Sequence, residues 1–380
     1  MSSSDDFAVV VIGAGVIGAA LTYALASRGA TTCLLEAESE PGLGASGTNS
    51  GILHVAFDST PGELETELIL RSAAARDPVL DRLGVPVIRC GAVVTPRDED
   101  ERTTVAALAD GARQNGVDAS VRDDGALEIP GESVTDPAAY TRGLVAVAAA
   151  GDADVRTSAR VDGIERAGEG LAVHTAGGDR VTCRAAVNCA GLHGDEVARL
   201  AGDESFEVYP RKGEFFVFEP PDGRPLERIL LPVPTKRTKG VLVFPTVDGK
   251  VIAGPTAHDQ DDKADWSVRP EAFDEVMPKA IAALPSLEGA EPIASYAGLR
   301  PAGRGVNYVI GASAACAGLF NAAAIRSTGV SASLGIAERV VSLLETYGIE
   351  LGAERELPAQ SPDPDAAPWW RRAARRGALV

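Results

Sequence analysis

Residues 7–18 of the sequence read FAVVVIGAGVIG, and this stretch decides the fold. The apolar, β-favouring run at its start predicts a buried parallel strand, and the glycines after it predict a turn into a helix over residues 16–28. Gly13 permits the tight turn, Gly15 lets a pyrophosphate approach the backbone, and Gly18 lets the helix pack closely on the strand. The stretch therefore predicts a dinucleotide site, with the phosphates held at the N-terminus of the helix.

A second strand is predicted at residues 31–35, and it ends in Glu36, eighteen residues after Gly18. A carboxylate at this place accepts hydrogen bonds from the ribose hydroxyls of an adenosine and disfavours a 2′-phosphate. The pattern therefore predicts NAD or FAD rather than NADP.

The next segment separates these two cofactors. Residues 42–51 read GLGASGTNSG, a run of small and hydroxyl residues where a plain nicotinamide domain would continue into its next helix. Such a loop is suited to follow an extended dinucleotide, with its hydroxyls and amides on the pyrophosphate and the flavin end. We therefore favour FAD. A flexible Gly/Ser linker is the alternative interpretation.

Composition excludes several classes of protein. The chain has 380 residues, enough for about two domains, and its 36 Lys and Arg against 54 Asp and Glu give a net charge of -18. This acidic balance argues against a nucleic-acid partner. The five cysteines contain no C-x-x-C spacing, so we expect neither a disulfide framework nor a metal site, and a cytoplasmic location fits.

The N-terminal apolar run resembles a membrane segment in length alone. Residues 7–27 contain no charged side chain, and a run of this length is sufficient to span a bilayer. However, acidic residues, Asp5 and Asp6, precede it where a signal peptide has basic ones, and three glycines interrupt it. We predict neither a signal peptide nor a membrane span.

Further motifs occur along the chain in the order of a known family. They are NSGILH at 49–54, NCAG at 188–191, PRKGEF at 210–215, GPTA at 254–257, GLRP at 298–301 and IRSTGV at 325–330. Together with the glycine motif they make the chain resemble the FAD-dependent oxidoreductases of the D-amino-acid-oxidase (DAO) superfamily, from Val9 to about Val340. Within it, the chain resembles the branch of L-2-hydroxyglutarate oxidases and FAD-dependent glycerol-3-phosphate dehydrogenases.

The resemblance implies an α/β fold in which a FAD-binding, Rossmann-like domain of the glutathione-reductase type is interleaved with a mixed-sheet α+β substrate domain. We expect the FAD-binding half to comprise residues 1–85, 145–205 and 295–345, the substrate half residues 86–144 and 206–294, and a C-terminal extension residues 346–380.

The resemblance also implies which residues contact FAD. Val161 belongs to the stretch whose backbone contacts the adenine in this family, and the helix after Gly329 directs its N-terminal amides toward the flavin, where its dipole would stabilise the anionic reduced form. The full set expected to bind the cofactor is Gly13, Gly15, Val16, Ile17, Gly18, Glu36, Ala45, Ser46, Thr48, Asn49, Ser50, Gly51, Val161, Ala190, Gly191, Arg300, Gly329, Val330 and Ser331.

Oxidation of an alcohol by FAD moves a hydride to the flavin and needs a base for the hydroxyl proton. His54 follows the flavin-contacting loop and is the first candidate for the base or for a flavin contact. A structural histidine and a covalent flavin attachment are the alternative interpretations. His258 is a second candidate that could touch the substrate. His193 is expected to pack near the cofactor and His174 to lie on the surface.

Arg300 aligns with the arginine that binds the anionic group of the substrate in this superfamily, and a guanidinium grips a carboxylate or phosphate with two hydrogen bonds. Arg326 is a candidate second contact, or a salt-bridge residue of its loop. A basic cluster in the substrate half suits the approach of an anion, with a solvated loop patch as the alternative. Its members are Arg211, Lys212, Lys236, Arg237 and Lys239, of which we expect Lys212 to bind substrate.

The strings PRKGEF and PTKRTKG look more like those of the glycerol-3-phosphate dehydrogenases. We therefore expect oxidation of a CH–OH group in glycerol 3-phosphate or a similar substrate, and secondly of a 2-hydroxy acid such as L-2-hydroxyglutarate. An amino-acid or amine oxidase, or a flavin-binding subunit of a larger complex, are further alternatives. The electron acceptor is left open between quinone and oxygen.

The tail at 369–376 reads WWRRAARR after a Pro-rich linker. Such a segment is suited to rest on an anionic membrane surface, at the inner face of the membrane, which would fit a quinone acceptor. A disordered tail is the alternative interpretation.

Overall fold

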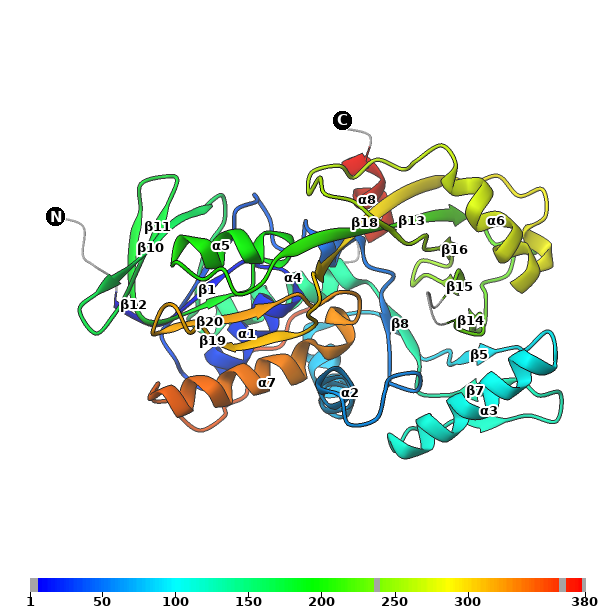
Figure 1. Ribbon diagram of the computed structural model, residues 1–380, viewed down its shortest axis with the longest axis horizontal. Coiled ribbons are helices and arrows are strands. Elements are labelled where there is room, and N and C mark those ends of the chain that lie inside the picture. The colour runs from blue at the N-terminus through cyan, green and yellow to red at the C-terminus, as the bar shows by residue number, and fades with distance from the viewer. Residues whose placement is uncertain (1–5, 236–239, 362–366, 378–380) are drawn as a thin grey trace.

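The glycine motif folds as its pattern predicts. In the computed structural model, which describes residues 6–235, 240–361 and 367–377, strand β1 (Asp6–Ile12) leads through the glycine turn into helix α1 (Val16–Ser27). Strand β2 (Thr32–Leu35) follows and pairs with β1 in parallel. This β-α-β unit lies in the left half of the molecule (Figure 1).

The first sheet has eight strands and is built around β1. Its path is β10-β11-β12-β1-β2-β9, with β20 beside β12 and β19 beside β20. The additional strands are β9 (Asp154–Arg156), β10 (Val161–Ala167), β11 (Gly170–Thr175), β12 (Arg180–Asn188), β19 (Val309–Ala312) and β20 (Leu319–Ala323). The strands β9, β2, β1, β12 and β20 run parallel to one another, as a dinucleotide-binding sheet requires.

The second sheet is mixed and has nine strands among the residues that the structure describes. Its path is β17-β13-β16-β15-β14-β5-β7-β6, and β18 pairs with β13. The strands are β5 (Ala92–Val94), β6 (Ser120–Val121), β7 (Leu127–Ile129), β13 (Val208–Phe218), β14 (Ile229–Leu231), β15 (Leu242–Pro245), β16 (Val251–Gly254), β17 (His258–Asp259) and β18 (Ala294–Gly303). A small third sheet joins β3 (Ile52–Leu53), β8 (Ser133–Thr135) and β4 (Val87–Ile88).

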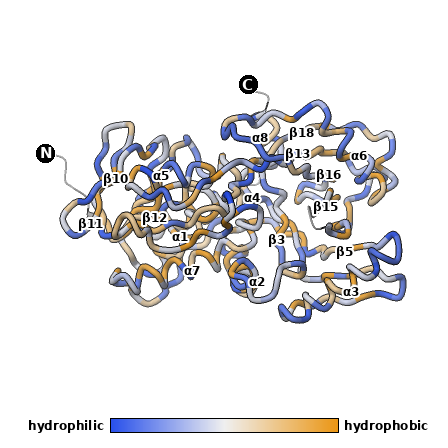
Figure 2. Tube along the Cα trace, viewed as in Figure 1, coloured by the Kyte–Doolittle hydropathy of each residue, from blue (hydrophilic) through white to orange (hydrophobic). Residues whose placement is uncertain are grey.

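Helices cover the sheets. The further helices are α2 (Leu64–Leu83), α3 (Glu99–Gln114), α4 (Pro137–Ala150), α5 (Gly194–Leu200), α6 (Ala272–Ala283), α7 (Gly329–Tyr347) and α8 (Trp369–Gly377), with short 3-10 turns η1 (Ala45–Thr48), η2 (Gly191–His193) and η3 (Pro285–Leu287). A large buried apolar cluster joins α1, α4 and α7 to the first sheet, and Figure 2 shows the hydrophobic character of these elements. None of the helices in the described parts of the chain has both the length and the apolar character needed to cross a bilayer.

The architecture is the α/β arrangement predicted, with a Rossmann-like sheet and a mixed sheet. The strands of the two sheets alternate along the chain, since β5 to β7 come between β2 and β9, and β13 to β18 come between β12 and β19. We propose that the two sheets mark two interleaved domains, with β18 in the mixed sheet rather than in the FAD-binding half expected for residues 295–345.

The pairing register between β13 and β18 determines which of their side chains share a face of the sheet. The two antiparallel strands pair from Val208↔Gly303 to Val217↔Ala294, which places Arg211 opposite Arg300. Successive residues of a strand point to opposite faces. The side chains of the neighbouring pair, Lys212 and Leu299, therefore point to the face opposite to that of Arg211 and Arg300.

The C-terminal tryptophans contradict both interpretations of the tail. Trp369 and Trp370 begin helix α8, which packs on β18 and η1, and both side chains are buried, with Trp369 at 0% exposure. They are therefore neither part of a disordered tail nor available to a membrane surface. An amphipathic segment rich in Trp and Arg has the composition of a membrane-binding helix, but here its apolar face is covered by the protein itself.

Candidate active site

A cavity of about 770 Å³ opens between the two sheets, and both contribute to its wall. Its size lies within the usual range for small-molecule sites, about 300–1,000 Å³. The first turns of α1 and α7, the loop around η1 and strands β13 and β18 all supply lining residues. The cavity therefore joins the glycine turn to the paired arginines of the β13–β18 ladder.

The end of the cavity at α1 has the donors and acceptors of a dinucleotide site. The Glu36 carboxylate accepts hydrogen bonds from the backbone N–H of Ala14 at 2.6 Å and of Glu38 at 2.9 Å, and burial raises its pKa. The Ser46 hydroxyl accepts from the N–H of Val16, at the start of α1, at 2.9 Å. A Cβ at Gly18 would lie 1.9 Å from the carbonyl oxygen of the glycine turn, so only glycine allows this close packing of helix on strand.

Most of the residues expected to bind FAD lie in the wall of this one cavity. They are Gly13, Gly15, Val16, Ile17, Glu36, Ala45, Ser46, Thr48, Asn49, Ser50, Val161, Ala190, Gly191, Arg300, Gly329 and Val330. The helix N-terminus suits a pyrophosphate, the Glu36 carboxylate suits a ribose, and the first amides of α7 suit the flavin. The residues therefore fit FAD.

Three residues of the expected set stand behind the wall. Gly18 packs α1 on its strand, and Gly51 has its N–H bonded to the side chain of Asn49 at 2.9 Å. The Ser331 hydroxyl accepts from the N–H of His54 at 2.8 Å and donates to the carbonyl of Ile52. These residues support the site without lining it.

His54 lines the cavity and is held by a buried carboxylate. Its Nδ1 lies 2.9 Å from Oε2 of Glu132, which has 0% exposure, and the other oxygen of Glu132 accepts from the N–H of Val55 at 2.9 Å. Arg76 donates to the carbonyl of His54 at 2.9 Å. A carboxylate against Nδ1 favours the tautomer with the proton there, which leaves Nε2 as the acceptor. Glu132 is a site residue that sequence reasoning missed.

Arg300 also lines the cavity, and its positive charge has no carboxylate partner among the described residues. Its guanidinium donates to the carbonyls of Thr256 at 3.0 Å and Arg211 at 3.4 Å. Burial, together with Arg211 and Arg326, lowers the pKa of Arg300 to about 10. A Cβ at Gly213 would lie 2.3 Å from the guanidinium, so the glycine of PRKGEF makes room for it. This arrangement favours an anionic ligand.

Two further arginines stand near Arg300. Arg211 lines the cavity and pairs with Asp259 at 2.5 Å. Arg326 lines it as well, is exposed, and has no ion pair within the described parts of the chain. The salt bridge considered for Arg326 is therefore not seen there, and its guanidinium is part of the cavity wall.

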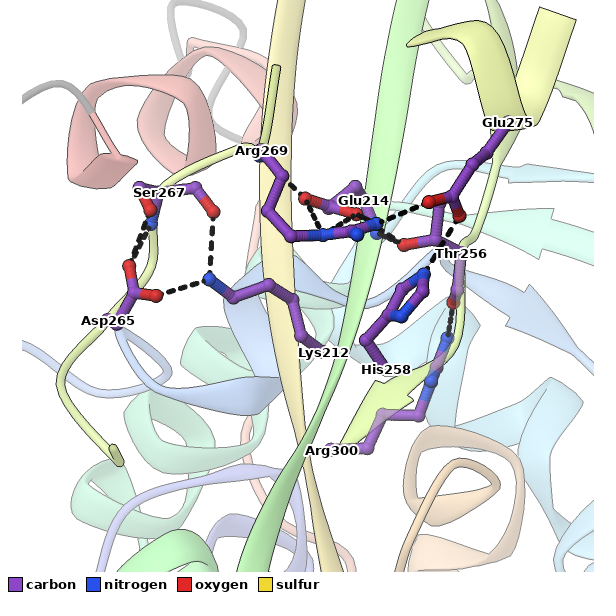
Figure 3. A network of polar contacts seen from close by, with 9 residues as sticks. All are labelled: Lys212, Glu214, Thr256, His258, Asp265, Ser267, Arg269, Glu275 and Arg300. Carbon is purple, nitrogen blue, oxygen red and sulfur yellow. Dashed lines mark hydrogen bonds and ion pairs between the residues drawn. The ribbon is translucent and has the colours of Figure 1, made fainter. Parts of the chain in front are cut away.

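Lys212 does not reach the cavity, contrary to the prediction. Its ammonium is 2.7 Å from Asp265 and 3.0 Å from the carbonyl of Ser267, and the residue is only 1% exposed. Figure 3 shows Lys212 reaching toward these partners while Arg300 reaches toward Thr256. The strand alternation explains this, because Arg211 lies on the face of β13 that borders the cavity and Lys212, the next residue, lies on the opposite face. The remaining members of the expected basic cluster lie outside the described residues, namely Lys236, Arg237 and Lys239.

We expect Asp265→Asn to lower the free energy of unfolding by about 1–2 kcal/mol at neutral pH, because Lys212 stays buried without its counter-ion while solvent reaches the 265 side chain. Hydrogen bonds from Lys212 and Ser267 lower the pKa of Asp265 from 3.8 to about 2. A carboxylate with a lowered folded-state pKa stabilises above its unfolded pKa and loses this effect as the pH falls to the folded value. Urea unfolding should therefore show the gap between parent and variant closing from pH 4 to pH 2. A gap that is constant over this range would contradict the ion pair.

The other histidines differ in their access to the cavity. His258 is absent from the wall although residues 255–257 are part of it, and its Nε2 lies 2.8 Å from Glu275 (Figure 3). Contrary to the prediction, it does not face the place where a substrate would lie. His193 lines the cavity and pairs with Glu196 at 2.9 Å. His174 lies on β11, and its Nε2 is 3.1 Å from Oε1 of Glu165 on the neighbouring strand β10.

A buried network supports Arg300 from behind. Glu214, at 0% exposure, accepts from Arg269 at 2.7 Å and from the Thr256 hydroxyl at 2.6 Å (Figure 3). The same threonine offers its carbonyl to Arg300. The ion pair between Glu214 and Arg269 therefore holds Thr256 in place, and the carbonyl of Thr256 orients the guanidinium of Arg300. In the sequence, Glu214 belongs to the PRKGEF motif, and nothing there predicts its contact with Arg269 or Thr256.

Comparison with known proteins gives consistent results. A family model described as "FAD dependent oxidoreductase" (DAO) matches residues 8–343. Glycerol 3-phosphate dehydrogenase of Caloramator mitchellensis is 29% identical over 355 residues, which are 89% of this chain and 74% of that protein. L-2-hydroxyglutarate dehydrogenase of Escherichia coli is 25% identical over 266 residues, 65% of this chain and 63% of that protein. The chain therefore spans less than two thirds of the latter.

Among solved structures, the dithionite-reduced L-α-glycerophosphate oxidase of Mycoplasma pneumoniae with FAD bound superimposes with a TM-score of 0.82. The two sequences are 24% identical, and the match covers 97% of this chain and 98% of that one. At this identity the likeness shows the shared fold.

Proposed function

The chain belongs to the DAO family of FAD-dependent oxidoreductases, and from this membership we propose that it oxidises the CH–OH group of a small anionic alcohol, with glycerol 3-phosphate as the first candidate substrate. The protein is an FAD-dependent enzyme and FAD is its cofactor.

The observation that carries the proposal is the pairing of two groups in one cavity. Arg300 presents a guanidinium without a carboxylate partner in the described residues, and His54 presents an imidazole backed by Glu132. An anionic alcohol offers one group to each, since its phosphate or carboxylate suits the fork of the arginine and its hydroxyl suits the histidine.

When bound, FAD supplies the acceptor for the hydride that leaves the substrate carbon. The residues of the chain do the remaining work. Arg300 binds the anionic group and thereby orients the carbon that is oxidised. The Nε2 of His54 takes the hydroxyl proton, and the buried carboxylate of Glu132 stabilises the imidazolium that results. The first amides of α7, at Gly329 and Val330, add partial positive charge to the wall.

A 2-hydroxy acid such as L-2-hydroxyglutarate is the second candidate. A guanidinium binds carboxylate and phosphate with the same fork geometry, and L-2-hydroxyglutarate dehydrogenases are among the relatives. The additional cation Arg326 in the cavity wall favours the more highly charged phosphate ester.

Anaerobic mixing of the FAD-loaded protein with each candidate tests the proposal. We expect glycerol 3-phosphate to bleach the flavin absorbance rapidly and in proportion to enzyme. Faster bleaching by L-2-hydroxyglutarate would select the second candidate, and bleaching by amino acids alone would overturn both. Readmission of oxygen, or addition of a soluble quinone, then identifies the acceptor that restores the colour.

A further inference from the structure

Helix α8 lies beyond residue 343, where the family match ends, yet it forms part of the cofactor cavity. It packs on η1 and on β18, the segments that carry Thr48 and Arg300 into the cavity wall, and Figure 1 shows it beside β18. A segment outside the matched region therefore completes a site that the matched region forms.

Two tryptophans fasten this helix. The indole N–H of Trp369 donates to the carbonyl of Asn49 at 2.9 Å, and Asn49 lines the cavity. The indole N–H of Trp370 donates to the carboxylate of Asp248 at 3.1 Å, on the substrate half. Because both rings are buried, α8 has a defined position relative to the loop at η1.

Arg376, in the last turn of α8, faces the cavity. Its guanidinium donates to the carbonyl of Leu43, forms an ion pair with Glu38 at 3.3 Å and stacks 4.3 Å above the ring of Trp266. The side chain is 29% exposed and belongs to the cavity wall together with Gly42. These three contacts therefore hold the guanidinium of Arg376 beside the loop at 42–44.

The loop beside Arg376 is tied to the glycine turn. The N–H of Gly42 donates to the carbonyl of Ala14 at 3.0 Å, and the hydroxyl of Ser46 accepts from the first amide of α1. The first turn of α1, VIGA at 16–19, holds no basic side chain of its own. A diphosphate at this place carries full negative charge, whereas a helix N-terminus offers only about half a positive charge.

We infer that Arg376 is a cofactor-binding residue, whose guanidinium, paired on one side with Glu38, adds positive charge beside the diphosphate of FAD from a helix outside the family core. The inference rests on FAD as the cofactor and is independent of the substrate. It also explains why an amphipathic, arginine-rich helix is buried against the η1 loop.

The test measures FAD affinity of the full chain after removal and reconstitution of the cofactor, by quenching of flavin fluorescence. Arg376→Gln is expected to raise the Kd for FAD by about 10- to 100-fold, the effect of losing one charge-assisted contact. Arg376→Lys, which keeps the charge, is expected to recover most of the affinity. Arg375→Gln removes the same charge from the exposed neighbour on α8 and should stay within about twofold of the parent.

Ionic strength gives a second readout. Salt should weaken FAD binding to the parent more steeply than binding to Arg376→Gln, because the variant lacks the charge that salt screens. Equal losses in the glutamine and lysine variants, or parallel salt slopes, would overturn the contact with the diphosphate. Melting of each cofactor-free variant, followed by circular dichroism, checks that α8 remains packed. No substrate enters these measurements, so their failure is distinct from failure of the proposed reaction.

Discussion

Replacing Glu132 with glutamine is expected to lower kcat by about 10²- to 10⁴-fold while KM for the anionic substrate changes little. The N–H of Val55 is a fixed donor to this side chain, so the amide oxygen of the glutamine will turn toward it. The amide NH₂ then faces Nδ1 of His54 and favours the tautomer with its proton on Nε2. An imidazole in that form cannot accept the hydroxyl proton.

Steady-state kinetics and anaerobic flavin reduction measure this effect, with Glu169→Gln on the exposed β10–β11 turn as the matched control. Combination with His54→Gln tests whether the two residues act as one unit, in which case the double variant is no slower than the worse single variant. A Glu132→Gln enzyme with parent-like kcat would remove His54 from the role of base. An unchanged melting temperature of Glu132→Gln would show that its lower kcat does not come from a loss of folding.

Replacing Arg300 with alanine is expected to raise KM for the anionic substrate by about 30- to 5,000-fold, which corresponds to about 2–5 kcal/mol for a desolvated ion pair. The guanidinium is oriented by the carbonyl of Thr256 and has no carboxylate partner among the described residues, so its charge is available to the ligand. Arg300→Lys is expected to restore only part of the binding, because an ammonium cannot form the planar fork.

The matched control for this experiment is Arg304→Ala. Arg304 follows β18 and pairs on the surface with Glu207 at 2.8 Å and Asp261 at 3.0 Å, so its loss should leave KM within about twofold. FAD content, read from the absorbance ratio of flavin to protein, should stay near the parent value in both variants. An unchanged KM in Arg300→Ala would exclude this residue from substrate binding.

The glycine turn and its helix could be predicted because their signals are local. Gly13, Gly18 and the apolar run before them specify a strand, a turn and a close helix–strand contact within twelve residues. Glu132 could not be predicted, since it lies 78 positions from His54. The two meet only because β3 pairs with β8, with Ile52 opposite Val134, and nothing in either segment alone predicts that pairing.

The contrast between Arg211 and Lys212 has the same cause. Both are basic and adjacent, so the sequence offers no means to choose between them. The register of β13 against β18 determines which one enters the cavity, and a shift of one residue would exchange them. The position of the C-terminal tryptophans likewise depends on tertiary packing, because their pattern suits a membrane and a protein surface equally well.

The bond between Trp369 and Asn49 joins residues that are 320 positions apart. At translation rates of about 5–20 residues per second, the loop around Asn49 waits about 15–60 s on the ribosome before its partner helix is synthesised. During that interval the carbonyl of Asn49 lacks its hydrogen bond from Trp369, and the two tryptophan rings cannot yet pack against the loop. Completion of the cofactor cavity, to whose wall Arg376 of this helix belongs, is therefore a late event in the life of the nascent chain.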